Sequence, residues 1–383
     1  MAGESTSESA RPTSARTLLT STKLQGLRPK CQTPVVLRFE CSVDHALKVL
    51  SAQKILSAPV VACSESDAPD DCTDVIGFID IRDVLVSFLS DLDMVKCMKG
   101  QSMLHCMHAL EEAGKAFGTK KLQDLHELGG DGTFLLDTGM SKVSVMELVH
   151  NGFLYPHETK AVHNGEHSRT VVHRVGLFNK TGHITNIISQ SDVVRWLQQH
   201  QASLGALKGM TAQQLGWADK QIKSMPAKTP AIECLAQMQQ SGLSAIAITD
   251  GTDSNQLIGN FSVSDLRSIE SEHFGSLALP VGEFLALEHG LEYWGVADHD
   301  QVKASPAAVF ANKRRQEREP GPGDMVGQSL VTCTSQDTFS TIIDRIVEHH
   351  LHRVYVVNDR GQAVGVVTLT DLLRRVTEEA RKA

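Results

Sequence analysis

The sequence predicts a mixed fold of the α/β (α+β) class, in which a helix, two strands and a second helix recur four times along the chain. Three observations carry this prediction. A set of aspartates superposes at the end of the second strand of each unit. The segments that enter the first strand also superpose. These segments alternate in sequence, which indicates that the four units form two tandem pairs.

The fourth unit is the most regular part of the chain. Its first helix is predicted from Phe339, Ile342 and Ile346, which fall on one helical face. Thr334 and Asp337 precede that helix at the spacing of a capping box. The sequence therefore predicts where this helix begins and which side of it is buried.

Two strands follow that helix in close succession. They are predicted over 354–357 and 364–367, with a turn over 358–361 between them and a second helix starting at 368–371. The same order, helix, strand, strand and helix, is expected in the other three units.

The aligned aspartates lie in similar surroundings. In the last three units, hydroxyl side chains precede the aspartate by one and by three positions, whereas the first unit has Asp80 and Arg82 there. The aspartates are Asp83, Asp192, Asp265 and Asp371, and the hydroxyl residues are Ser189, Ser191, Ser262, Ser264, Thr368 and Thr370.

An aspartate at a helix start can accept two hydrogen bonds from the vicinal hydroxyls of a ribose. A single such residue is more simply explained as a helix cap favoured by the macrodipole. Four copies in equivalent positions favour ribose binding, and the hydroxyl residues around them leave room for a nucleoside.

The segments that enter the first strands supply positive charge. The second and fourth units carry His173-Arg174 and His352-Arg353, whereas the first and third carry Ser-Ala. Arginine binds phosphate oxygens with its fork of N–H groups, and histidine adds a further donor. Because the positions match, pseudo-symmetry is expected to bring both pairs towards one central axis, although such pairs also occur as surface charge at a strand edge.

The unit that ends in [ST]-x-[ST]-D resembles the cystathionine-beta-synthase (CBS) repeat. Four such units with His-Arg in the second and fourth resemble the gamma regulatory subunit of the AMP-activated and sucrose-non-fermenting protein kinases, over most of residues 34–376. The resemblance implies two CBS pairs (Bateman modules) packed as a pseudo-symmetric disc. It also implies phosphate contacts from the His-Arg pairs and nucleoside contacts from Thr229 and Ser244.

The resemblance further implies AMP, ADP or ATP as a regulatory ligand, with no catalytic cofactor. The implied partners are a catalytic protein kinase subunit and a scaffolding beta-type subunit. On this basis we expect a non-catalytic energy sensor that regulates a serine/threonine kinase complex. The alternatives are a free-standing CBS protein that binds an adenosyl ligand and regulates a metabolic or redox enzyme, and an interaction scaffold without ligand.

Three departures from the family pattern rank the expected sites. The first unit has Leu56 where the family usually has an arginine, and Asp80 and Arg82 replace its hydroxyl residues. Asp192 is present where the best-known gamma subunits have a basic residue. The positions of Asp265 and Asp371 are therefore expected to be the best sites, Asp192 the next, and Asp83 the weakest.

Composition excludes several classes of function. The chain has 383 residues, of which 41% are hydrophobic, so it can bury the cores of two lobes. A formal net charge of -8 argues against binding to nucleic acid or to an anionic membrane. The sequence has no apolar run as long as a membrane span and no nucleotide-hydrolysis, esterase or kinase catalytic motif. We expect a cytoplasmic protein that is not an enzyme, with a nuclear location as an alternative.

Cysteines and histidines are numerous but scattered. Eight cysteines show no paired spacing, so we expect reduced thiols and no metal centre. A metal site remains an alternative at the histidine clusters over 349–352 and 157–173.

Domain boundaries follow from the repeats and from composition. Inserts over 64–74, 155–170 and 291–323 are predicted to be loops or linkers, and the last of them alternatively a docking or modification segment. The serine- and threonine-rich start is predicted to be disordered, with an organellar transit peptide as the alternative. The predicted regions are 1–30 (tail), 31–205 (first pair), 206–377 (second pair) and 378–383 (tail).

Overall fold

The computed structural model describes residues 14–27, 34–63, 72–93, 98–125, 132–156, 172–289 and 330–382. The insert predicted over 291–323 lies outside the described residues, as do most of those over 64–74 and 155–170.

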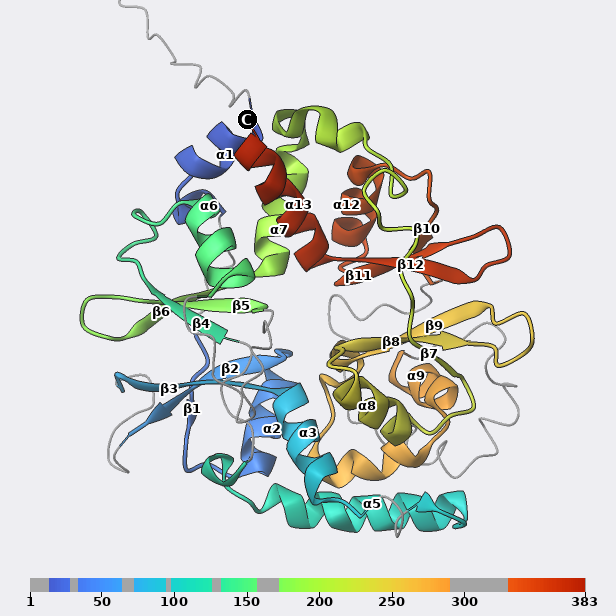
Figure 1. Ribbon diagram of the computed structural model, residues 1–383. Coiled ribbons are helices and arrows are strands. Elements are labelled where there is room, and N and C mark those ends of the chain that lie inside the picture. Colours follow the sequence, from blue (N-terminus) through green and yellow to red (C-terminus); the bar gives the residue numbers. More distant parts are fainter. Residues whose placement is uncertain are drawn as a thin grey trace, which may run out of the picture.

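Each repeat builds one three-stranded sheet, and all four sheets have the same topology (Figure 1). The first strand pairs parallel to the second, and the second pairs antiparallel to the third with one shift of register. The strands are β1 (Leu37–Arg38), β2 (Ser57–Ala62), β3 (Asp74–Asp80), β4 (Gly132–Leu136), β5 (Arg174–Phe178), β6 (Ile184–Ser189), β7 (Ser224–Pro226), β8 (Ala245–Thr249), β9 (Leu257–Ser262), β10 (Thr332–Cys333), β11 (Arg353–Val357) and β12 (Ala363–Thr368).

Helices cover one side of each sheet, and the four predicted units with their mixed helix-and-sheet class are confirmed. The helices are α2 (Val43–Ala52), α3 (Ile81–Asp91), α5 (Met103–Gly118), α6 (Val145–Glu147), α7 (Gln190–Gln199), α8 (Ala231–Gln240), α9 (Val281–His289), α12 (Phe339–Glu348) and α13 (Leu369–Lys382), with a π-helical continuation of α6 over Leu148–Leu154. In the described part of the chain no helix is long and apolar enough to span a membrane.

The third repeat differs from the prediction of a second helix after Asp265. A 3-10 turn, η6 (Val263–Leu266), takes its place, and a second 3-10 segment, η7 (Ser271–Ala278), follows. Helix α5 packs closely against η7, because a Cβ on Gly114 would lie only 2.3 Å from the Ser271 carbonyl oxygen. The extra helix α5 therefore occupies space beside this part of the third repeat.

Two large hydrophobic cores join the repeats across the predicted pairs. One core contains the helices of repeats 1 and 3 with α5, and the other contains the helices of repeats 2 and 4. The sheets of repeats 1 and 2 face each other, as do those of repeats 3 and 4, so the four units form a ring (Figure 1). This arrangement is the disc expected from four repeats in two pairs.

Helices are present in both regions that were predicted to be tails, and the helix in the N-terminal one corrects the prediction that this tail is disordered. Residues 15–21 form helix α1, and Leu18 and Leu19 are 1% exposed against the core of repeats 2 and 4. Helix α13 runs to Lys382, and Ala380 is buried. Helix α1 was missed because its apolar side packs against distant parts of the chain: α1 lies beside α13 and α6 in Figure 1.

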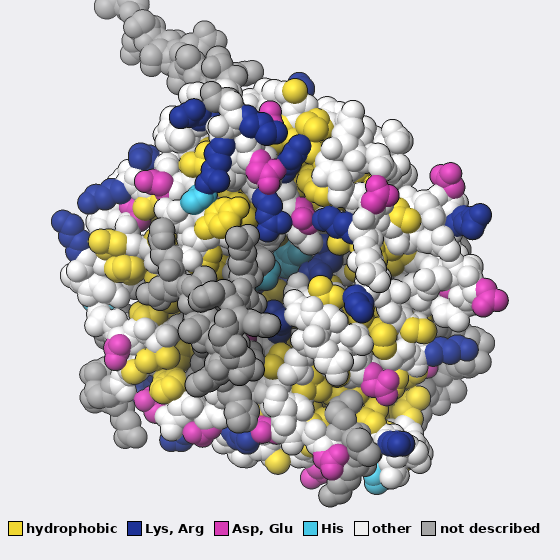
Figure 2. Space-filling view, viewed as in Figure 1, with side chains coloured by type: hydrophobic (Ala, Val, Ile, Leu, Met, Phe, Trp, Pro, Cys, Tyr) yellow, Lys and Arg dark blue, Asp and Glu magenta, His cyan; other side chains and the backbone are white. Residues whose placement is uncertain are grey.

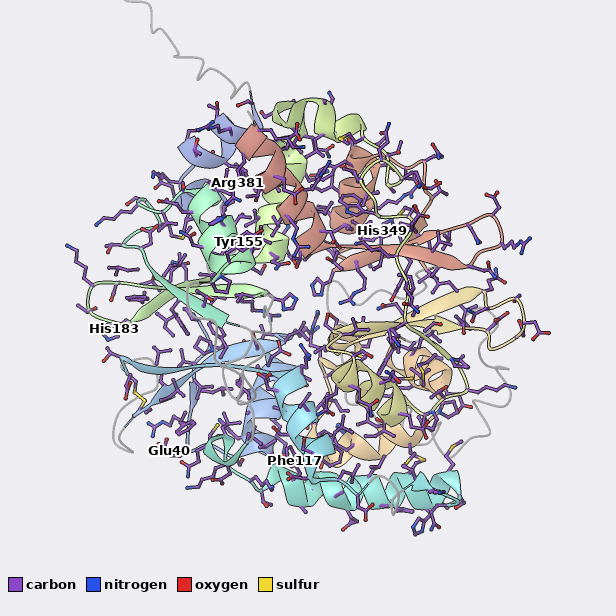
Figure 3. All side chains as sticks on the ribbon, in the orientation of Figure 1. Glu40, Phe117, Tyr155, His183, His349 and Arg381 are labelled. Carbon is purple, nitrogen blue, oxygen red and sulfur yellow. A yellow bond between two sulfur atoms is a disulfide. The ribbon has the colours of Figure 1, made fainter. Side chains whose placement is uncertain are left out.

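A disulfide corrects the prediction that all cysteines are reduced. Cys63 and Cys72 are bonded, with their α-carbons 5.8 Å apart (Figure 3). They flank the ends of β2 and β3, where Ala62 pairs with Asp74, so the antiparallel hairpin brings them together.

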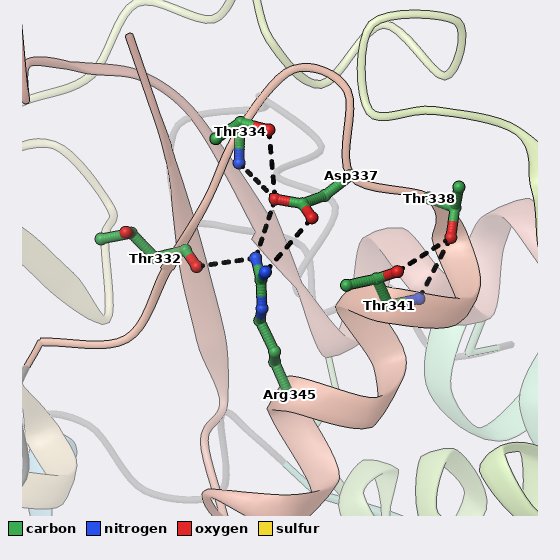
Figure 4. A network of polar contacts seen from close by, with 6 residues as sticks. All are labelled: Thr332, Thr334, Asp337, Thr338, Thr341 and Arg345. Atoms are coloured by element: carbon green, nitrogen blue, oxygen red, sulfur yellow. Dashed lines mark hydrogen bonds and ion pairs between the residues drawn. The ribbon is translucent and has the colours of Figure 1, made fainter. Parts of the chain in front are cut away.

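The start of the fourth repeat differs in detail from its predicted cap. The backbone N–H of Thr334 does donate to Asp337, at 2.7 Å, but α12 begins later, at Phe339, and its cap is Thr338. Arg345 binds both carboxylate oxygens of Asp337 at 2.8 and 3.2 Å (Figure 4). Asp337 thus fixes the loop ahead of the helix to the helix itself.

Candidate functional site

The four aligned aspartates all close a capping box at the end of a third strand. In each, the Oδ2 oxygen accepts the backbone N–H three residues upstream, a geometry typical of helix starts. The donors and distances are Asp80 to Asp83 at 3.0 Å, Ser189 to Asp192 at 2.9 Å, Ser262 to Asp265 at 2.7 Å and Thr368 to Asp371 at 2.9 Å. Capping engages one oxygen of each carboxylate, so a second role for the other oxygen is compatible with it.

The hydroxyls of Ser189, Ser262 and Thr368 strengthen these boxes. Each donates to the Oδ2 oxygen of its aspartate, at 2.7, 2.8 and 2.7 Å respectively. These residues therefore hold the aspartates in a fixed orientation.

In two repeats, the remaining oxygen meets a cation that the sequence did not single out. Asp192 Oδ1 lies 3.0 Å from Arg195 Nη1, one turn along the same helix. Asp371 Oδ1 lies 3.2 Å from Lys220 Nζ, which comes from the segment between repeats 2 and 3. No local sequence pattern predicts this contact, because Lys220 and Asp371 lie 151 positions apart in the chain.

The two His-Arg pairs meet near the centre of the molecule. The pKa of His352 is lowered from 6.5 to about 3, mainly by burial and further by the positive charges of Arg174, Arg353, Arg267 and His173. Figure 2 shows histidine and basic side chains together in the hollow at the centre of this face. The two His-Arg pairs therefore lie close together, as their equivalent positions in the repeats predicted. Arg267, which was not predicted, lies near them.

Five predicted residues gather between repeats 3 and 4. Arg353 Nη2 donates to Ser244 Oγ at 2.9 Å, and His352 Nδ1 lies 3.1 Å from Ser264 Oγ. Burial lowers the pKa of Arg353, while the nearby charge of Asp265 acts in the opposite direction. This group, which we call the 3/4 cluster (Ser244, Ser264, Asp265, His352 and Arg353), combines a carboxylate, two hydroxyls, an imidazole and a guanidinium.

The corresponding arginine of the second repeat has a different partner. Arg174 Nη1 forms an ion pair with Asp80 Oδ2 at 3.2 Å, and the Asp80 side chain is only 7% exposed. Asp80 is the residue that replaces a hydroxyl in the first repeat. The irregular first repeat therefore supplies a carboxylate to the arginine that was expected to bind phosphate.

The remaining predicted residues lie at the edges of these groups. Thr370 is buried between repeats 2 and 4, where its hydroxyl donates to Gln190 at 3.1 Å. Ser191 is half-buried at the start of α7. Thr229 is half-buried before α8, and its carbonyl oxygen accepts the Val281 N–H at 2.7 Å. Among the described residues, no three His, Cys, Asp or Glu side chains come together as a metal site would require.

Comparison with known proteins identifies the repeat. Residues 323–378 match the family model of the CBS domain. This part of the chain, which contains the fourth repeat, is therefore a CBS domain. The sheet of this domain has the same topology as the sheets of the other three repeats.

Curated proteins that are similar to this chain include kinase gamma subunits. It is 29% identical to the 5'-AMP-activated protein kinase subunit gamma of Saccharomyces cerevisiae over 156 residues, which is 40% of this chain and 37% of that protein. It is 22% identical to the SNF1-related protein kinase regulatory subunit gamma-like PV42a of Arabidopsis thaliana, covering 89% of this chain and 90% of that protein. The resemblance to gamma regulatory subunits thus extends over most of the chain.

A solved structure shares the fold. Protein MJ1225 from Methanocaldococcus jannaschii aligns with a TM-score of 0.54 at 14% identity, covering 92% of this chain and 99% of that one. The overall fold of this chain therefore has a counterpart among the solved structures.

Proposed function

We propose that this CBS-domain protein is a non-catalytic regulatory subunit that binds adenine nucleotides, AMP, ADP or ATP, and thereby regulates a serine/threonine protein kinase. The observation that carries the proposal is the 3/4 cluster. Asp265 offers carboxylate oxygens to a ribose, while Arg353 and His352 offer donors to phosphate in a half-buried setting. The gamma-subunit names of the similar proteins support the kinase as the regulated partner.

The electrostatics of the cluster favour an anionic ligand. Burial, reinforced by the surrounding basic side chains, lowers the pKa of His352 and keeps it neutral, so an incoming phosphate meets one ring N–H on His352 and the charged guanidinium groups of the arginines. A phosphate would offset the mutual repulsion of these groups. Regulation requires that the competing nucleotides differ in affinity between two states of the complex.

Calorimetric titration of the full chain tests the binding proposal. AMP is expected to bind at least about tenfold more tightly than adenosine, since charged hydrogen bonds contribute about 1.5–3 kcal/mol each. Asp265→Asn is expected to weaken both ligands, and Asp359→Asn, on an exposed turn, serves as the matched control. Equal affinity for AMP and adenosine, or no binding by folded protein, would overturn the proposal.

The partners need a separate measurement. A catalytic kinase subunit and a beta-type scaffolding subunit are expected to co-purify with the native chain from the cytoplasm, the location that the sequence predicts. Recovery of the chain with a metabolic or redox enzyme in place of a kinase would instead favour the alternative of a free-standing CBS regulator.

A further inference from the structure

Lys220 is held at the fourth aspartate by three hydrogen bonds. Its ammonium group donates to Asp371 Oδ1 at 3.2 Å and to the Val366 carbonyl oxygen at 3.0 Å. Its backbone N–H donates to the Val364 carbonyl oxygen at 3.1 Å. The side chain therefore follows the open edge of β12 and ends on the carboxylate.

The segment that carries Lys220 is fixed against repeat 4. Trp217 is 5% exposed, and its carbonyl oxygen lies so close to Gly365 that a Cβ there would come within 1.8 Å. Upstream, the Ala212 N–H donates to the Asp337 carbonyl oxygen at 2.9 Å. Figure 1 shows this segment passing across β12 on its way to β7. Lys220 is thus positioned by packing on both sides, unlike a lysine that is free in solvent.

The contacts of Asp371 leave little room for a ribose. Its Oδ2 oxygen accepts two hydrogen bonds from Thr368, as Asp265 Oδ2 does from Ser262, so its Oδ1 oxygen makes the difference. Its Oδ1 oxygen accepts the Lys220 ammonium group. A ribose diol needs two acceptor positions on the carboxylate, and a cation bound at close range competes directly with its hydroxyls.

The ion pair between Arg195 and Asp192 differs from the one between Lys220 and Asp371. Arg195 reaches Asp192 from one turn along the same helix, and its side chain is 41% exposed. Such a pair contributes about 0.3–0.5 kcal/mol and can open when a ligand arrives. Lys220 is less exposed, at 32%, and is held by the packed segment around it.

We propose that Lys220 is a specificity-determining residue that occupies the ribose position of Asp371 and thereby excludes nucleotide from the aspartate of repeat 4. The inference rests on the proposed function, because it concerns which of the four aspartates can accept the same ligand. The position at Asp371 opens when Lys220 withdraws.

The test counts AMP sites by calorimetry on the full chain and its variants. Lys220→Met keeps the apolar stem and removes the charge, and it is expected to raise the number of AMP sites per chain by one. The added site is expected to disappear in the double variant Lys220→Met/Asp371→Asn. Lys223→Met, at an exposed position three residues along the same segment, is the matched control and is expected to keep the native number.

The outcomes separate this inference from the proposed function. A native chain that binds AMP and a Lys220→Met chain with the same number of sites would overturn the inference alone. No binding by either folded chain would overturn the proposed function and the inference together. If Lys220→Met does not fold, as judged by circular dichroism, Lys220→Ala makes the same test, because the backbone bond to Val364 does not depend on the side chain.

Discussion

The two pairs of repeats share one scaffold but differ at equivalent positions. Arg174 in the first pair is bound to the carboxylate of Asp80, whereas Arg353 in the second pair is bound to the hydroxyl of Ser244. A carboxylate neutralises a guanidinium, and a hydroxyl leaves its charge available. The second pair is therefore the better prepared of the two for a phosphate.

The two pairs also differ in the contacts between their facing sheets, which are more polar in the second pair. In the first pair, the ring of Phe78 stacks on Phe134 with centroids 4.9 Å apart, beside Gly176. At the position equivalent to Gly176, the second pair has Tyr355, whose hydroxyl donates to Asn260 at 3.0 Å. One interface is closed by apolar contacts and the other contains a polar contact. A few substitutions on a repeated scaffold therefore change both the partner of the equivalent arginine and the packing between the facing sheets.

The largest expected effect separates the two arginines. Arg353→Gln should weaken AMP binding about 100-fold, because charged hydrogen bonds contribute about 1.5–3 kcal/mol each and 1.4 kcal/mol is tenfold in affinity. Arg174→Gln should weaken it less than about tenfold, since Asp80 already binds this side chain. Calorimetry on both variants measures the two losses of affinity. Equal losses would contradict the prediction that Arg353 contributes more to AMP binding than Arg174.

The second effect concerns the carboxylate of the first pair. Asp80→Asn leaves the partly buried Arg174 without its counter-charge and should lower the free energy of unfolding by about 1–3 kcal/mol, less than for a fully buried pair. Added inorganic phosphate should restore more stability to this variant than to the native chain. Urea denaturation measures both, with Asp91→Asn, from the exposed pair with Lys120, as the control. An unchanged stability would show that Asp80 does not hold Arg174.

The third effect is a pH dependence centred on His352. The pKa of His352 is lowered to about 3 in the folded chain, so the unfolded chain binds its proton more readily and stability falls as the pH drops below about 6.5. Between pH 7 and pH 5 the loss should be about 1–2 kcal/mol. It should be reduced in His352→Gln and retained in His45→Gln, which changes an exposed position. Thermal unfolding at both pH values measures it, and identical losses in native and His352→Gln chains would contradict it.

The smallest effect tests the polar interface of the second pair. Tyr355→Phe removes the donor to Asn260 and should cost about 1 kcal/mol of stability. A double-mutant cycle with Asn260→Ala should give a coupling energy of similar size. Additive effects of the two substitutions would show that the hydrogen bond does not stabilise the pair.

Local patterns were enough to predict the repeats and much of the site. The four aspartates, their hydroxyl neighbours and the two His-Arg pairs could be predicted because each depends on a few adjacent residues repeated at equivalent positions. The convergence of the His-Arg pairs could be predicted because it follows from symmetry. The short parallel strands such as β1 and β10 were missed, since two residues carry too little pattern to predict a strand.

Contacts between distant segments could not be predicted in this way. The placement of Lys220 on Asp371 depends on how the segment between the pairs packs against Gly365, which no local pattern contains. The docking of α1 depends in the same way on surfaces of repeats 2 and 4. Asp80 was noticed as a departure from the pattern, but its partner Arg174 lies 94 positions away.

The two helix cores have a consequence for how the chain unfolds. Every repeat packs against one neighbour through its sheet and against a different one through its helices. The four repeats therefore form a closed ring in which none is terminal. A half-chain containing repeats 1 and 2 would expose the helix surfaces that repeats 3 and 4 normally cover. The fragments are therefore expected to be unstable alone, and loss of order in one repeat should spread in both directions around the ring, as in a single cooperative transition.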